Sequence, residues 1–204
     1  MSSESPRRAA AHFRAALKGD PTSQSARFGL LATRRRAVEA NDPEASELAE
    51  PLEGAASAVV SGWRPAAAGE WPALRELEPE LASAEELEPA YQDAQRLRVR
   101  WRTASDDPAL HAEAVEIARD LLRNRAVPGD LILGAKAFAV ANQGEGALQI
   151  LDFLSNRHRK PWLVDAGVEL IDSLPPEVDQ AQRAAIRDRL IRRPGPAKGS
   201  IDDG

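Results

Sequence analysis

The chain has 204 residues, a formal net charge of −5 at pH 7 and 43% apolar side chains, enough for one large or two small globular domains. It contains no cysteine, which excludes disulfides, thiolate metal ligands and cysteine nucleophiles. No apolar run approaches the roughly 18–20 residues of a membrane span, and residues 1–8 lack the apolar segment of a signal peptide, so we expect a cytoplasmic protein with no membrane contact.

Three helices are predicted in the N-terminal part of the chain. The first covers residues 6–17, with Ser5 as N-cap ahead of a proline at its first position. The second covers residues 23–40, and both helices end at an Asp-Pro pair because the residue before proline avoids the helical region. The third covers residues 43–61 and contains Pro51, which predicts a kink or a break.

Glycine, proline and small residues cluster at residues 62–70, and this composition predicts a linker. A short acidic helix is predicted to start at Trp71 and to be interrupted near Pro79. A longer helix is expected at residues 85–103. Its last part, residues 96–102, alternates with the two-residue period of a strand, but we favour a helix because no second convincing strand exists for pairing.

The stretch from residue 108 to residue 174 is predicted to hold the main core. Its apolar residues recur at steps of three and four in four helical patterns, at residues 113–123, 131–141, 147–154 and 163–174. The second pattern is apolar almost all round, so we place it at the centre. The residues expected to form or border this core are Leu133, Phe138, Leu151, Phe153 and Ile171.

A helical period is also visible in this stretch. Three similar segments begin helices at spacings of 33 and 34 residues: Ala114-Val-Glu-Ile-Ala118, Ala147-Leu-Gln-Ile-Leu151 and Ala181-Gln-Arg-Ala-Ala185. Such a period is typical of tandem helix-turn-helix arrays, in which each unit buries its apolar face against the next.

Individual residues extend this likeness. Leu133-Gly134, Gly144-Glu-Gly-Ala147 and Pro161 stand where the tetratricopeptide motif has its Leu-Gly pair, its inter-helix turn with alanine, and its closing proline. Residues 110–193 therefore resemble tetratricopeptide-like helical repeats, although the motif's tryptophan is missing ahead of Leu133 and its tyrosine position is Ala137. The resemblance implies a concave surface that binds a peptide or partner protein, and it transfers no peptide-clamp residue to this chain.

We therefore expect an all-α fold of antiparallel helical hairpins, either a tetratricopeptide-like α-solenoid or an irregular helical bundle. The expected organisation is an N-terminal helical segment (1–61), a hinge or linker (62–70), a C-terminal repeat-like domain (71–193) and a disordered tail (194–204).

Charge is distributed in blocks along the chain. Residues 1–38 have a net charge of +6, residues 39–93 of −12 and residues 94–102 of +4. Such blocks either pair within the fold or attract a charged partner. The turn near Pro43 is expected to bring Arg27, Arg34 and Arg35 close to Glu44, Glu47 and Glu50. Residues assigned to partner binding are Glu76, Glu80, Glu85, Glu88, Arg98, Trp101 and Arg102.

A search for chemistry assigns no catalytic, cofactor-binding or metal-binding residue. His12, His111 and His158 stand in separate helical contexts without ligand spacing, and no nucleotide-binding or nucleophile motif is present. The expected function is therefore non-catalytic protein–protein interaction with a protein or peptide partner, a basic one given the acidic surplus, as in a bacterial adaptor, chaperone-like or scaffold protein.

Two alternatives remain open at this point. One is a helical regulator that contacts nucleic acid through the arginines of residues 34–36 and 96–102, although the sequence pI of about 5.4 disfavours it. The other is an enzyme without a recognisable local motif. The sequence does not determine the oligomeric state.

Overall fold

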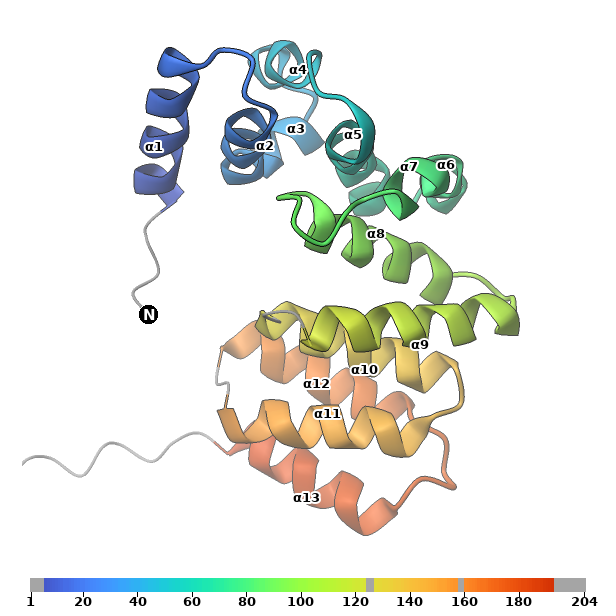
Figure 1. The fold of residues 1–204 in the computed structure, drawn as a ribbon. Coiled ribbons are helices and arrows are strands. Elements are labelled where there is room, and N and C mark those ends of the chain that lie inside the picture. Colours follow the sequence, from blue (N-terminus) through green and yellow to red (C-terminus); the bar gives the residue numbers. More distant parts are fainter. Residues whose placement is uncertain (1–5, 124–126, 158–159, 193–204) are drawn as a thin grey trace, which may run out of the picture. The chain divides into compact units, whose positions relative to one another are not determined.

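The computed structural model describes residues 6–123, 127–157 and 160–192, and it contains thirteen helices and no strand within them (Figure 1). The all-α prediction is confirmed. The chain divides into two compact units, Met1–Leu121 and Leu122–Gly204. Predictions on Ser5, His158 and residues 194–204 lie outside the described residues.

Five helices form the first half of unit 1: α1 (Pro6–Gly19), α2 (Gln24–Thr33), α3 (Arg35–Glu39), α4 (Pro43–Ala49) and α5 (Gly54–Ala68). The hydroxyl of Ser23 caps α2 by accepting a hydrogen bond from the Ala26 amide, and Asp42 caps α4 in the same way. The predicted helix 23–40 is divided at Arg34, where ψ turns to 22°. The break expected at Pro51 is present between α4 and α5.

Four helices complete unit 1: α6 (Trp71–Glu76), α7 (Glu78–Ala82), α8 (Tyr91–Thr103) and α9 (Pro108–Arg123), whose last turn reaches the division between the units. As predicted, the acidic helix is interrupted before Pro79, which lies in the first turn of α7. Residues 96–102 are helical, so the strand alternative is excluded. The helix predicted from residue 85 begins only at Tyr91, because Pro89 disfavours helical geometry in the residue before it.

Helix α5 lies at the centre of unit 1, packed against α2, α3, α6, α7 and α8 (Figure 1). Its buried face includes Val59, Val60 and Trp63, and the side chain of Trp63 is only 1% exposed. Burial of such large apolar side chains is the main stabilising contribution to the unit.

The prediction of a linker at residues 62–70 is wrong, because residues up to Ala68 belong to α5 and the chain divides between Leu121 and Leu122. A Cβ atom on Gly62 would lie 2.9 Å from Leu97 and 3.0 Å from Leu74, so this glycine permits close helix packing. Only Gly69, with a φ of 74°, acts as the helix-ending residue that its type suggests.

Unit 2 consists of two helical hairpins, α10 (Pro128–Val140) with α11 (Gly144–Arg157), and α12 (Pro161–Ser173) with α13 (Gln180–Ile191) (Figure 1). Helix α10 packs against α11 and α12, and α13 packs against the same two helices. Asp130 fixes the start of α10, because its buried carboxylate accepts a hydrogen bond from the Val127 amide at 2.9 Å.

The predicted core residues have different environments in unit 2. Leu151 and Ile171 are buried as expected, and Phe138 is half-buried against the same core. Leu133 is half-buried, and Phe153 is 44% exposed, so its prediction as a core residue is wrong. Phe153 lies on the outer side of α11, beneath the guanidinium of Arg157 at 4.4 Å from the ring centroid.

Helix α10 is partly covered, which corrects the prediction that it is enclosed at the centre. Its buried positions are small or polar, at Asp130, Gly134, Ala135 and Ala137, whereas Leu131 and Ile132 are half-buried. An apolar composition all round a helix shows that several faces can be covered, but not that they are. None of the helices within the described ranges has the length and apolarity that a membrane crossing requires.

Candidate functional site

The residues assigned to partner binding separate into two groups in unit 1. Glu76 in α6, Glu80 in α7, and Glu85 and Glu88 in the segment of residues 83–90 are all exposed. By contrast, the three residues from α8 face the interior: Arg98 is partly buried, and Trp101 and Arg102 are buried.

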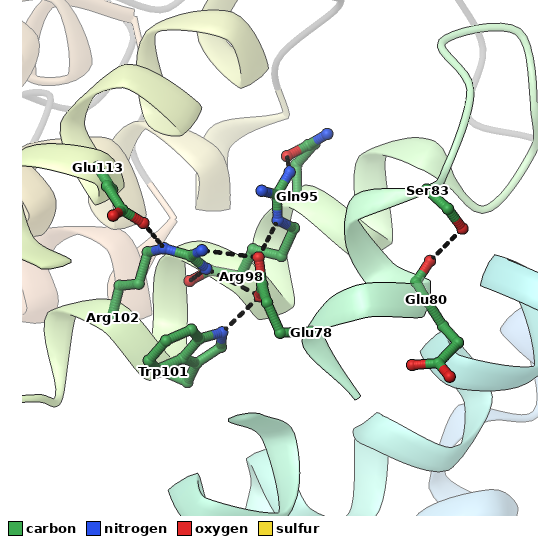
Figure 2. Close-up of polar contacts among 8 residues, drawn as sticks. All are labelled: Glu78, Glu80, Ser83, Gln95, Arg98, Trp101, Arg102 and Glu113. Carbon is green, nitrogen blue, oxygen red and sulfur yellow. Dashed lines mark hydrogen bonds and ion pairs between the residues drawn. The ribbon is translucent and has the colours of Figure 1, made fainter. Parts of the chain in front are cut away.

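The three α8 residues meet the carboxylate of Glu78 at the start of α7 (Figure 2). The two terminal nitrogens of Arg102 donate to separate Glu78 oxygens at 2.9 and 2.6 Å. The Trp101 indole donates to the same carboxylate at 2.9 Å, and Arg98 Nε donates at 2.9 Å. This two-point Arg–carboxylate geometry is the strong form of the ion pair, and it joins α7 to α8.

Arg102 connects this cluster to α9 as well. Its Nε atom donates to Glu113 at 3.0 Å, and its guanidinium lies 4.4 Å from the ring centroid of Trp101. Burial alone would raise the pKa of Glu78, but hydrogen bonds from Arg102 and Trp101 and the charge of Arg98 hold it below its ordinary value. Burial likewise opposes the charge on Arg102, yet its two carboxylate partners raise the pKa of the guanidinium.

The assignment of Arg98, Trp101 and Arg102 to a partner surface is therefore wrong, because their polar groups are bound within unit 1. The acid that pairs with these arginines is Glu78, which was not among the residues assigned from the sequence. Figure 2 shows the carboxylate of Glu80 directed away from the cluster. The helix break before Pro79 sets which face of α7 meets α8, and the sequence pattern does not specify that face.

The second set of predicted ion pairs is present in part. Arg34 pairs with Glu44 at 2.9 Å across the turn that precedes α4. Arg35 pairs with Glu39 inside α3, and Arg27 donates to the backbone oxygen of Leu48 and not to an acid. The pair joining α2–α3 to α4 therefore depends on Arg34, and because Glu44 is exposed, solvent screening keeps the contribution of this pair to stability small.

An open apolar groove runs between α1 and α2, with a volume of about 790 Å³. Its wall from α1 includes Phe13 and Ala16, its wall from α2 includes Phe28 and Ala32, and Pro89 also lines it. Gly29 lets Phe13 of α1 pack closely against α2, because a Cβ atom there would overlap the ring of Phe13. Exposed alanines such as Ala16 and Ala32 leave apolar surface in contact with solvent.

An acidic hollow of about 420 Å³ continues from the groove, and the two share Ser25, Phe28 and Pro89 as lining residues. Glu53 and Glu88 line this hollow, and both are exposed. The neighbouring residues Glu85, Glu86 and Leu87 are also exposed, with Leu87 at 97%.

Of the predicted acids, Glu88 lines the acidic hollow, whereas Glu76, Glu80 and Glu85 line neither the hollow nor the groove. Sequence reasoning did not identify Phe13, Phe28 or Ala32 as groove residues. The apolar residues at helical spacing in α1 include Phe13, and they could have identified one face of the groove. Such a pattern does not show that the neighbouring helix leaves this face half covered. Along the described ranges, no three potential ligands among histidine, aspartate and glutamate gather as a metal site would require.

The chain matches no protein-family model, no curated protein and no solved structure.

Proposed function

We propose that the protein is a non-catalytic interaction protein whose unit 1 binds an amphipathic segment of a partner protein. The groove between α1 and α2 receives the apolar side chains of that segment, and its basic residues lie against Glu53, Glu85 and Glu88. The observation that carries the proposal is the continuity of an open apolar groove with an acidic hollow. Helix-in-groove recognition uses this combination of an apolar channel and a charged rim.

The charges on the other wall of the groove are compatible with this orientation. Helix α1 carries several basic residues, but Phe13 and Ala16 are the α1 residues that line the groove. Glu53 and Glu88 line the acidic hollow that continues from the groove, and a basic flank on the partner complements their charge.

The arrangement of unit 2 supports the same class of function. Its hairpins begin at Pro128 and Pro161, 33 residues apart, and they pack against each other through α10 with α12, α11 with α13 and α11 with α12. This spacing agrees with the tetratricopeptide-like period, and repeat proteins of that kind use stacked hairpins as binding surfaces. We propose that unit 2 is a repeat-like scaffold that provides a further binding surface besides the groove of unit 1.

The test selects ligands without assuming a partner. Sixteen-residue peptides are selected from a random display library on the wild-type protein, and the expected ligands carry apolar residues at helical spacing and an excess of lysine and arginine. The double variant Glu85→Lys/Glu88→Lys should weaken their binding about tenfold at low salt, since two rim attractions become repulsions. Ala32→Trp, which fills the groove, should abolish binding.

Matched variants separate the groove from general effects. Glu76→Lys/Glu80→Lys makes the same charge change outside the groove, and Ala11→Trp places the same ring on an exposed position of α1 that does not line it. Both should leave binding unchanged. Selected peptides without excess positive charge, or equal binding to wild type and Ala32→Trp, would refute the proposal.

A further inference from the structure

A second hollow in unit 1, distinct from the groove, lies between α4 and α5, and Asn41 in the turn after α3 also lines it. Its volume is about 320 Å³, at the lower end of the roughly 300–1,000 Å³ typical of small-molecule sites. Ala45 and Val60, both buried, contribute to its apolar lining. Polar residues surround this apolar lining, and Asn41, Glu50, Ser61 and Arg64 among them are exposed.

Two opposite charges line the hollow without pairing with each other. Glu50 follows the last turn of α4, and Arg64 lies in α5. In the described part of the chain, neither side chain has an ion pair or a hydrogen-bond partner. Elsewhere in unit 1 charges of opposite sign at neighbouring helices do meet, as in the pair of Arg34 and Glu44 at 2.9 Å.

Hydroxyl groups line the wall between these charges. Ser57, Ser61 and Arg64 follow one another at steps of four and three, so they share one face of α5. Over the described ranges, the hydroxyls of Ser57 and Ser61 form no hydrogen bond with another residue. Both hydroxyls can donate and accept, so they can bind either charged end of a ligand.

The turn after α3, which contributes Asn41 to the lining of the hollow, is held in a defined conformation. Asn41 lines the hollow and has a φ of 57°, in the left-handed region that asparagine tolerates better than most residues. Backbone hydrogen bonds from Asn41 to Val38 at 3.0 Å and from Asp42 to Ala37 at 3.0 Å fix this turn. The amide of Asn41 is therefore presented by rigid backbone, as a selective site requires.

We propose that this hollow binds a small zwitterion of the free α-amino acid class, with its carboxylate at Arg64 and its ammonium group at Glu50. A ligand that carries only one sign of charge would leave the other charged group unmatched and would meet repulsion from it. A zwitterion satisfies both, and Ser57, Ser61 and Asn41 supply the neutral hydrogen bonds that orient it.

Isothermal titration calorimetry of the full chain tests this site. The probes are the individual L-α-amino acids, with succinate and putrescine as ligands that carry a single sign of charge. We expect at least one amino acid to bind and neither single-sign probe to bind. Arg64→Gln and Glu50→Gln should each weaken the amino acid at least tenfold, and Ser57→Leu, which fills the hollow, should abolish binding.

The matched controls are Arg36→Gln and Glu47→Gln, exposed residues of α3 and α4 that do not line the hollow. They should bind the amino acid as the wild type does. Absence of binding by every amino acid overturns the proposal, as does binding that survives both Arg64→Gln and Glu50→Gln, or equal binding of succinate or putrescine. The display experiment on the groove uses other residues, so failure of one proposal leaves the other standing.

Discussion

Replacement of Glu78 by glutamine tests the internal ion-pair cluster of unit 1. Glu78 accepts hydrogen bonds from Trp101 at 2.9 Å, from Arg98 at 2.9 Å and from both terminal nitrogens of Arg102. Arg102 is only 5% exposed, so the variant leaves a buried guanidinium with Glu113 as its remaining acid. Breaking such a pair at one partner costs about 3–5 kcal/mol, and the remaining contact to Glu113 places the expected loss near 3 kcal/mol.

The assay is urea unfolding at neutral pH, followed by far-UV circular dichroism and by tryptophan fluorescence. Glu80→Gln is the matched control, because Glu80 is an exposed acid of the same helix, and its effect should stay within about 0.5 kcal/mol. A loss below about 1 kcal/mol for Glu78→Gln would show that the cluster does not stabilise unit 1, and the structural reading of α7 and α8 would be refuted.

The pH dependence of the same comparison has a definite sign. The folded-state pKa of Glu78 lies below its ordinary value of 4.5, so its stabilisation is complete above pH 4.5 and is lost as the pH falls through the folded-state pKa. The difference in unfolding free energy between wild type and Glu78→Gln should therefore be constant at neutral pH and shrink in acid. A difference that grows in acid would contradict the assigned ion pairs.

Three further predictions concern packing and a single titration. Gly146→Ala should destabilise unit 2 by about 1–3 kcal/mol because its Cβ atom would overlap the ring of Phe138, and the penalty should disappear when Phe138→Ala is also present; a penalty of equal size in both backgrounds would exclude this contact. Phe153→Ala should change the unfolding free energy by less than about 1 kcal/mol in the same urea assay, because the side chain is 44% exposed. Ultraviolet titration of the chain's one tyrosine, Tyr91, should give a pKa of about 12, raised mainly by its hydrogen bond to Asp120, and Asp120→Asn should return it toward 10.0; an unchanged titration would show that Asp120 is not its partner.

Local signals in the sequence determined most of the helices. Caps and prolines act within a few residues of where they stand, so Ser23, Pro51 and Pro79 predicted a helix start and two interruptions that the structure contains. The helical stripe likewise identified Leu151 and Ile171 as core residues. These features follow from backbone geometry and from the period of the helix, which need no information on distant parts of the chain.

Other features depend on which helix face meets which neighbour, and only the tertiary structure decided them. Residues 62–68, with Gly62, Pro65 and three alanines, look like a linker, but they are the last part of α5, and Gly62 packs closely against Leu74 and Leu97. Glu78 and its arginines are about twenty residues apart in sequence, and several exposed acids were equally plausible partners. Phe153 is of a residue type that is common in cores, and yet its side chain is 44% exposed.

The candidate site illustrates the same division. The sequence contained the acidic surplus around Glu85 and Glu88, and this surplus predicted a basic partner. The apolar groove arises because α1 covers only part of α2, and Pro89 from the segment before α8 adds to its lining. A stripe of apolar residues indicates which face of a helix is buried. Which neighbouring helix covers that face depends on packing between segments far apart in the chain.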